Sequence, residues 1–194
     1  MPALSDISIE WAAPGDAGEL ADVLAPAFED YVSVVIGDME RAKRVIPKII
    51  RSMDGIMYKA VVDGRVVGAI IVTMDRPKFL ARNAFSMLAT LGLRRAMRAN
   101  AMAVDYMRSE PERRKEEAWV EAVGVLVDSR RKGIGSRLIE MASDEVGKRG
   151  RTALSLAVKR DSPAVSFYEE LGFQKAGEFD NKLGGWYRMR LELG

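Results

Sequence analysis

A valine-rich segment followed by a basic, glycine-containing turn most constrains what this chain can fold into. From Trp119 to Val127 a valine stands at nearly every second position, which predicts a buried strand. After the turn, apolar residues recur at helical spacing from Ile134, so we predict that a helix begins near that residue. The rest of the chain is expected to assemble around this strand–turn–helix unit.

The turn has the chemistry of an anion site. A helix start leaves backbone N–H groups unpaired and carries the positive end of the helix dipole. Glycines there let a ligand approach the backbone, and basic side chains add charge. These features predict a phosphate or pyrophosphate seat, while an ordinary solvated basic turn stays open as the alternative. The residues expected at the ligand are Arg130, Arg131, Lys132, Gly133, Ile134, Gly135 and Ser136.

Spacing separates this turn from other phosphate loops. The Gly-x-Gly-x-x-Gly dinucleotide pattern fails because its last position is Leu138. The Walker loop fails because Lys132 precedes the glycines. What remains, Arg130-x-x-Gly133-x-Gly135 after a valine-rich strand, resembles the pyrophosphate-binding motif of the GNAT acyltransferases. The resemblance implies that this segment holds the diphosphate of acetyl-CoA.

A second motif supports the same family. The string Tyr168-Glu169-Glu170-Leu171-Gly172-Phe173 resembles the other GNAT signature, a short helix ending in Tyr-x-x-Leu-Gly-Phe. By itself it is more typical of an apolar helix face. The two motifs stand in the expected order with a strand between them, and the signatures span Trp119 to Phe173. The Lys-Glu-Glu-Ala-Trp string and the helical segment before it resemble most closely the puromycin N-acetyltransferase-like branch, whose drug substrate we do not carry over.

The resemblance implies a fold and a domain plan. We expect residues 1–194 to form a single GNAT-like domain of the α/β (α+β) class. Its central sheet should be mixed and mostly antiparallel, flanked by helices, with a helical insertion before the central strand. Periodicity and turn residues predict further strands at 7–11, 57–62, 66–74, 152–158, 173–178 and 186–193. Helices are predicted from Asp16 to Ala27, at 39–53, at 84–109 with a break at Gly92, and at 163–171. Residues 110–117 are predicted to form a polar connector.

Composition excludes several kinds of chemistry. The 194-residue chain has no cysteine and no histidine, which excludes thiol nucleophiles, Ser-His-Asp triads and most zinc sites, so we expect no metal. A net charge of +2 argues against nucleic acid or a membrane surface as the main partner. No apolar run approaches transmembrane length and no signal-peptide core is present, so we expect a cytoplasmic protein.

The resemblance also implies where the thioester lies. In the family the two central strands separate at a bulge and pantetheine enters between them. The backbone of Val123, Gly124 and Val125 should line that gap, and Gly124 is expected to mark the bulge or a close approach. A backbone N–H there would stabilise the oxyanion. Asp161 stands where the family often has Asn, so we expect it to contact CoA differently and to help cap the next helix.

Two side chains are candidates for proton transfer. Glu121 interrupts the apolar strand, on the same face as Val123 and Val125 unless a bulge shifts the register, and is the leading general base because no histidine exists. Burial would raise its pKa toward about 6–7. The alternative is a rim or ion-paired Glu121 on a half-exposed strand. Glu117 is the reserve base, acting through water. The resemblance places the Tyr168 hydroxyl near the thioester sulfur, as the acid.

We therefore predict an N-acetyltransferase that moves an acetyl group from acetyl-CoA, its co-substrate, to a primary amine of a small molecule or peptide by direct attack. A catalytically silent acyl-CoA-binding or sensor module is the alternative. A third reading is a nucleic-acid-associated protein that uses the arginines at 94 to 98 and at 130 to 132. The acceptor is expected between Phe28-Glu29-Asp30-Tyr31 and residues 182–187. The sequence leaves open the acceptor's identity and whether the chain forms a homodimer.

Overall fold

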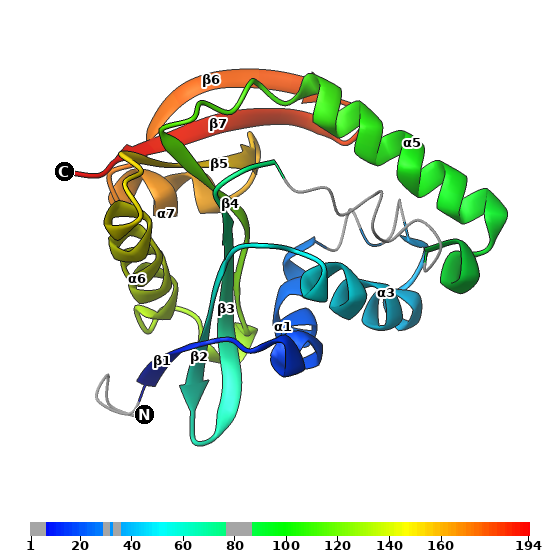
Figure 1. Cartoon of the computed structure of the whole chain (residues 1–194), viewed down its shortest axis with the longest axis horizontal. Coiled ribbons are helices and arrows are strands. Elements are labelled where there is room, and N and C mark those ends of the chain that lie inside the picture. Colours follow the sequence, from blue (N-terminus) through cyan, green and yellow to red (C-terminus); the bar gives the residue numbers. More distant parts are fainter. Residues whose placement is uncertain (1–6, 29–31, 33–35, 77–86) are drawn as a thin grey trace.

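A computed structural model describes residues 7–28, 32, 36–76 and 87–194, and these build one twisted sheet with helices on both faces (Figure 1). The strand order in this described part is β1-β2-β3-β4-β5-β7-β6. Only β4 and β5 pair in parallel there, and the other neighbours are antiparallel. The predicted mixed, mostly antiparallel sheet is confirmed. The strands are β1 Ile7–Trp11, β2 Ile56–Val62, β3 Arg65–Thr73, β4 Glu117–Val125, β5 Ala153–Lys159, β6 Gln174–Asn181 and β7 Gly184–Glu192.

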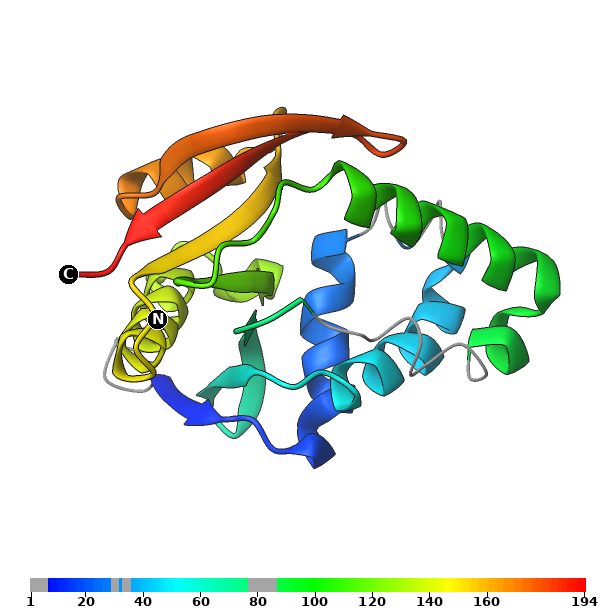
Figure 2. The same cartoon turned by 45° about the horizontal axis from the view of Figure 1, so that its top comes forward.

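The helices divide between the two faces of the sheet (Figures 1 and 2). α6 and α7 cover one face, where α6 contributes Leu138, Ile139 and Ala142 to the larger core cluster. α1 packs on the other face, against Ala69 and Ile71 of β3. α3 and the long α5 lie beyond α1 and join through a third cluster. The helices are α1 Ala17–Leu24, α3 Met39–Arg51, α5 Leu93–Ser109, α6 Ile134–Lys148 and α7 Ala164–Glu170, with 3-10 turns η2 Pro14–Asp16, η3 Ala25–Phe28 and η5 Val127–Ser129.

Local signals predicted most element ends correctly. α6 begins at Ile134, as its apolar spacing indicated. Asp63 and Gly64 turn the β2–β3 hairpin with φ of 50° and 73°, the left-handed values that such a two-residue turn needs. A helical segment at 87–91 and α5 meet at Gly92, whose φ is 74°, so the expected break is there. In the last hairpin the predicted turn was too long. β6 continues three residues further, to Asn181, and β7 begins two residues earlier, at Gly184, because these residues pair with one another.

The bulge in β4 lies at Glu121, not at Gly124. Val72 of β3 pairs with Val120, while the neighbouring Ile71 pairs with Ala122, so Glu121 is the extra residue. Gly124 pairs regularly with Ala69. An extra residue turns the strand and changes which face its side chains take. Glu121 therefore leaves the face of Val123, which packs on the α6 side, and points to the opposite side of the sheet.

The parallel pair at the centre of the sheet is short. β4 and β5 pair from Glu117 with Ala153 to Val120 with Leu156, and no further. Both strands continue beyond this point, β4 to Val125 and β5 to Lys159. The two strands therefore separate at the bulge, as the resemblance implied. Among the described residues, no strand pairs with the β5-facing edge of β4 over its last five residues.

Candidate active site

The turn before α6 carries a set of unpaired backbone donors. Gly133 precedes the helix with a φ of 73°, a left-handed conformation that favours glycine, and Arg131 has a φ of 58°. The first helical hydrogen bond runs from Arg137 N–H to the Gly133 carbonyl. The N–H groups of Ile134, Gly135 and Ser136 thus precede the helical ladder and have no intrahelical acceptor. They point at the space in front of the helix, where the dipole favours an anion.

The three basic residues of the turn are not equivalent. Arg130 donates from Nε to the Val125 carbonyl at 3.0 Å, and Lys132 donates from Nζ to the Asp128 carbonyl at 3.0 Å. Both side chains thus stabilise the turn itself. Arg131 is exposed and has no hydrogen bond or ion pair within the described chain. Arg131 is therefore the basic side chain of this turn that is available to a bound anion.

Two glycines near the turn serve packing. A Cβ on Gly135 would lie 3.1 Å from Cζ of Phe167, so the missing side chain lets α7 pack closely against α6. A Cβ on Gly68 of β3 would lie 2.9 Å from Cγ2 of Ile134. Ile134 is 2% exposed and anchors the first turn of the helix against the sheet. Close packing on both sides holds the N-terminus of α6 beside the end of β4.

The free edge of β4 presents backbone groups to the gap between the strands. Leu126 N–H donates to the Val67 carbonyl of β3. Because successive residues of a strand direct their N–H and C=O groups to alternate edges, Val123 and Val125 direct theirs away from β3. The Arg130 bond to the Val125 carbonyl agrees with this direction. The N–H groups of Val123 and Val125 and the Val123 carbonyl therefore face the gap, while Gly124 bonds toward β3.

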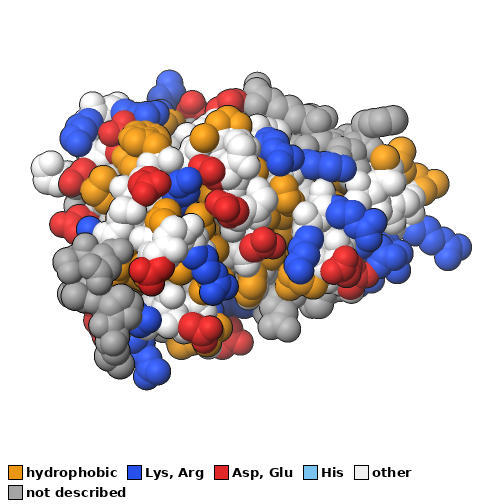
Figure 3. All heavy atoms as spheres, turned by 90° about the horizontal axis from the view of Figure 1, so that it is seen from below, with side chains coloured by type: hydrophobic (Ala, Val, Ile, Leu, Met, Phe, Trp, Pro, Cys, Tyr) orange, Lys and Arg blue, Asp and Glu red, His pale blue; other side chains and the backbone are white. Residues whose placement is uncertain are grey.

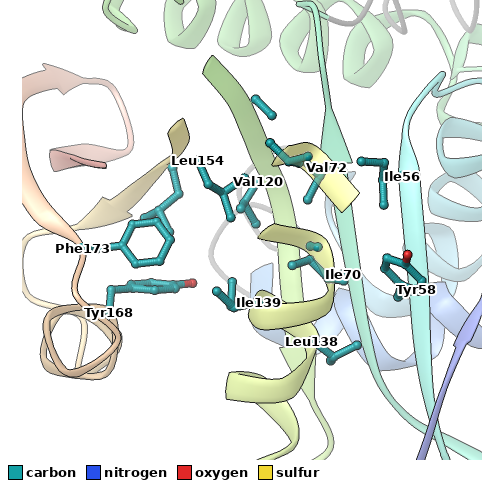
Figure 4. Close-up of a cluster of buried hydrophobic side chains, with 14 of the residues drawn as sticks. Ile56, Tyr58, Ile70, Val72, Val120, Leu138, Ile139, Leu154, Tyr168 and Phe173 are labelled. Carbon is teal, nitrogen blue, oxygen red and sulfur yellow. The ribbon is translucent and has the colours of Figure 1, made fainter. Parts of the chain in front are cut away.

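Tyr168 lies at the α7 side of the same gap. Its side chain is 8% exposed and packs edge-on against Phe173, with ring centroids 5.6 Å apart. The hydroxyl points toward α6, on the side of Ile139 (Figure 4). Burial raises the pKa of Tyr168 to about 12, so the hydroxyl keeps its proton at neutral pH. Nothing in the described chain hydrogen-bonds it, which leaves the proton available to a ligand.

Glu121 is held by an ion pair on the opposite face. Its Oε1 accepts from Thr73 Oγ1 at 2.6 Å and from an Arg113 guanidinium nitrogen at 2.5 Å. The ion-paired alternative of the sequence analysis therefore describes its geometry. A base in this arrangement must accept a proton while Arg113 stays beside it. The catalytic roles of Glu121 and Tyr168 remain predictions.

Arg113 is a site residue that the sequence analysis did not single out. It pairs with Glu110 at 3.1 Å as well as with Glu121, and its guanidinium lies 4.4 Å from the Trp119 ring centroid. Burial lowers the pKa of Arg113, but the two carboxylates outweigh burial and the net pKa is raised. Arg113 lies in the segment predicted as a polar connector. No local pattern distinguishes it from the exposed Arg114.

Glu117 has a structural role in this fold, because its buried carboxylate pairs with arginines. Its side chain is 1% exposed, and its Oε2 accepts from Arg188 and from Ser155. Arg190 lies 3.3 Å from its other oxygen. These contacts join β4 to β5 and β7. The reserve role as a water-linked base stays a prediction, and its oxygens already have cationic partners.

Asp161 does not cap α7. The Ser162 hydroxyl accepts from Ala164 N–H at 3.2 Å, and Asp161 is exposed. Gly172 ends the helix with a φ of 89°, as predicted. Asp161 follows β5 on the exposed side of the turn, so its contact with CoA stays a prediction.

The expected acceptor segments are only partly described. Phe28 ends η3, and Glu29, Asp30 and Tyr31 lie outside the described residues. The β6–β7 turn is tied to α5, because Lys182 N–H donates to an Asp105 carboxylate oxygen at 3.0 Å. Asn181 Oδ1 orders that turn by accepting from Leu183 N–H and from the Trp186 indole.

A cavity lies beside Arg113 on this side of the sheet. It has a volume of about 420 Å³ and lies between the end of β3, the C-terminal end of α5 and the connector. Arg113 faces this cavity and also bonds Glu121, so it connects the cavity to the bulge. The residues that line it are Met74, Asp75, Arg76, Met107, Arg108, Glu110, Glu112, Arg113, Arg114 and Lys115.

The comparison with protein families decides the assignment. The acetyltransferase (GNAT) family profile matches residues 22–173, which include both motifs and the separated strands. This chain belongs to the GNAT acetyltransferase family. No curated protein sequence matches the chain. The puromycin N-acetyltransferase-like branch stays a prediction.

Solved structures of GNAT enzymes share the fold at low identity. An agmatine N-acetyltransferase mutant in its apo form is 15% identical with a TM-score of 0.65, over 97% of this chain and 100% of that one. The ribosomal-protein-S18-alanine N-acetyltransferase from Escherichia coli is 17% identical with a TM-score of 0.54, over 97% and 94%. A Bacillus anthracis acetyltransferase in complex with acetyl coenzyme A is 17% identical with a TM-score of 0.50, over 73% and 64%.

Among the described residues, no group of three or more acidic side chains is placed to hold a metal ion. No helix among the same residues is long and apolar enough to cross a membrane.

Proposed function

We propose that this GNAT family member transfers an acetyl group from acetyl-CoA to a primary amine of a small molecule or peptide. The observation that carries the proposal is the separation of β4 from β5 after Val120 and Leu156, directly beside the N-terminus of α6. The gap combines free backbone donors, a helix start and a buried hydroxyl. A cytoplasmic location, as expected from the sequence, is part of the proposal.

The residues around the gap fit acetyl-CoA, which supplies an activated acetyl thioester when bound. The N–H groups of residues 134–136 and the Arg131 guanidinium would hold the diphosphate. Val123 would pair with pantetheine as an additional strand would, through its free N–H and C=O. The Val125 N–H, or that of Val123, can donate to a carbonyl oxygen in the gap, where negative charge develops during transfer.

Proton transfer is assigned to side chains on the two faces of β4. Glu121 would accept the proton of the acceptor amine, from the side of the sheet where Arg113 and the cavity lie. The Tyr168 hydroxyl, which carries its proton at neutral pH, would donate that proton to the leaving sulfur. The bulge permits this division of roles, since it moves Glu121 away from the face on which Tyr168 packs.

A catalytically silent acyl-CoA-binding module is a second candidate, favoured by one specific observation. Both carboxylates near the bulge already accept hydrogen bonds from arginines, Glu121 from Arg113 and Glu117 from Arg188. A carboxylate oxygen that already accepts an arginine N–H has one lone pair fewer for the proton of an amine. Such a protein would bind acetyl-CoA and release no thiol with any amine.

One experiment separates the two candidates. Calorimetric titration of the full chain with acetyl-CoA is expected to show one site per chain. Thiol release is then followed with amines, amino acids, polyamines and peptide N-termini as acceptors. Binding with amine-dependent release supports the transferase, binding without release supports the silent module, and absence of binding contradicts both.

A further inference from the structure

The outer surface of α5 bears an apolar stripe that packs against nothing in the described part of the chain. Leu93 and Met97 are each 64% exposed, and Ala101 is also exposed. The three follow one another at four-residue spacing and therefore share one helix face. α5 packs on its neighbours through Ala99 and Met102 instead.

Arg94 and Arg98 flank this stripe on one side of the helix, and Arg95 lies further round, next to Gly37. Arg94, Arg95 and Arg98 are exposed on the same two turns of α5. α3 lies beside them, joined by a hydrogen bond from Lys48 Nζ to Thr90 Oγ1 and by shared core contacts. We call this the basic–apolar surface, made of the stripe residues Leu93, Met97 and Ala101 with the exposed basic residues Lys43, Arg44, Lys48, Arg51, Arg94, Arg95 and Arg98.

Charge is concentrated at this end of the molecule. α3 and residues 87–104 together contain eight Lys and Arg residues and one acidic residue, Glu40. Because the whole chain has a net charge of +2, its remainder is net negative. Lys and Arg side chains gather at the α3–α5 end in Figure 3, with hydrophobic side chains beside them. The small net charge of the whole chain does not reveal that positive charge is concentrated at one end. That net charge was the reason we expected no membrane partner.

We propose that the basic–apolar surface docks on an anionic lipid membrane. A second copy of the chain is disfavoured, because an isologous contact would place the arginines of one copy against those of the other. A nucleic acid would use the arginines but leave Leu93 and Met97 in water. An anionic bilayer matches both features, since the apolar face enters the headgroup boundary while the basic side chains meet lipid phosphates.

Docking in this way is compatible with the proposed function and does not depend on it. α5 and α3 lie on the opposite side of the sheet from α6 and α7 (Figure 1). The N-terminus of α6 and the gap beside Tyr168 would therefore face away from the lipid. The transferase would stay accessible to acetyl-CoA while bound.

The first test is co-sedimentation of the full chain with vesicles. Phosphatidylcholine vesicles with about 30% phosphatidylglycerol are compared with pure phosphatidylcholine at low salt. We expect binding to the anionic vesicles alone and release at about 0.5 M NaCl, where charges are screened within a few ångström. The triple variant Arg94→Glu/Arg95→Glu/Arg98→Glu should bind at least tenfold more weakly.

A control variant with the same change in net charge tests whether weaker vesicle binding comes from this surface or from the net charge of the protein. The triple variant Arg65→Glu/Lys148→Glu/Lys175→Glu reverses three exposed residues outside the basic–apolar surface. It should retain binding within about twofold. Equal loss of binding in both triple variants would overturn the proposal, as would failure of the wild-type chain to bind the anionic vesicles.

A second test reports insertion of the apolar stripe directly. Because the chain has no cysteine, Met97→Cys creates a unique site for an environment-sensitive dye. We expect a blue shift of its emission on anionic vesicles, and none for the same dye at Lys148→Cys, at the end of α6. Unshifted emission at position 97 would overturn the proposal even where sedimentation is positive. Binding to duplex DNA but not to vesicles would assign the surface to nucleic acid and also overturn it.

Discussion

The Arg113 guanidinium lies 2.5 Å from a carboxylate oxygen of Glu121, the residue at which β4 bulges. The contact joins the connector after α5 to the point where the two central strands begin to separate. Arg113 also pairs with the buried Glu110 and lies over Trp119. This ion pair thereby attaches the helical insertion to β4, the strand that contains the proposed general base.

Replacing Arg113 should destabilise the protein strongly. Arg113→Ala leaves Glu121 without its cation and Glu110 with Arg76 as its remaining partner. Removing one member of a buried ion pair typically costs about 3–5 kcal/mol of unfolding free energy. Urea unfolding measures the loss, with the exposed neighbour Arg114→Ala as the control, expected within about 0.5 kcal/mol of wild type. Similar stability of the two variants would show that the ion pair is not a significant constraint.

Glu121→Gln tests the proposed base. The amide keeps the shape of the side chain but cannot take a proton, so kcat should fall about 10²–10⁴-fold with the acetyl-CoA affinity unchanged. Steady-state kinetics and calorimetry measure the two quantities. Glu116→Gln, at an exposed position one residue before β4, is the control and should be fully active. If Glu121→Gln retained its turnover, another group would have to be the general base.

Tyr168→Phe tests the proposed acid. Turnover should decrease while acetyl-CoA binds with nearly the same affinity, because the ring still packs against Phe173. Phe167→Leu, on the same short helix, is a packing control that leaves the hydroxyl in place. Equal turnover of wild type and Tyr168→Phe would reject the assignment.

Tyr168 should also make stability fall at high pH. Its pKa is raised to about 12 from the ordinary 10.0, so the folded state holds a proton that the unfolded chain releases between these values. The contribution is present below pH 10 and is lost as pH rises toward 12, by about 2–3 kcal/mol for a two-unit shift. Denaturant unfolding at pH 9 and 11 should therefore show a smaller loss in Tyr168→Phe than in wild type. Parallel losses would contradict the raised pKa.

Reversing charge at the two ends of α6 should have unequal effects on cofactor binding. Arg131→Glu places a carboxylate where we expect the diphosphate and should weaken acetyl-CoA binding at least tenfold. Lys148→Glu makes the same charge change at the other end of the helix and should leave the Kd within about twofold. Calorimetry measures both. Equal weakening would indicate a general charge effect and remove the argument for the α6 N-terminus.

Gly68→Ala should disturb the anchoring of α6. Its Cβ would lie 2.9 Å from Ile134 Cγ2 and 3.1 Å from Leu138 Cδ1, which overpacks the core and should cost about 1–3 kcal/mol. Gly147→Ala adds the same methyl near the end of α6, where nothing lies within 4 Å, and should be neutral or stabilising by up to about 1 kcal/mol. Thermal unfolding distinguishes them. A Gly68→Ala protein as stable as wild type would show that α6 can shift without cost.

Local sequence patterns predicted the element plan because their causes are local. Asp63 and Gly64 take left-handed backbone conformations that define a hairpin turn, and the apolar spacing from Ile134 requires a helix with one buried face. The same patterns failed where a pairing partner decides the outcome. Gly124 was expected to mark the bulge or a close backbone approach, but which β4 residue is extra depends on how Val120 and Ala122 align with β3.

The sequence by itself determined the strand–turn–helix unit, the hairpins and the family, since turn conformations and helical periodicity depend on neighbours in the chain. Only the tertiary structure decided that Arg113 reaches Glu121, that Glu117 is buried against Arg188, and that Leu93 and Met97 lie in solvent. These outcomes depend on groups brought together from distant positions. A charged or apolar residue has the same local pattern whether its partner is water or a buried ion, so no local pattern distinguishes the two.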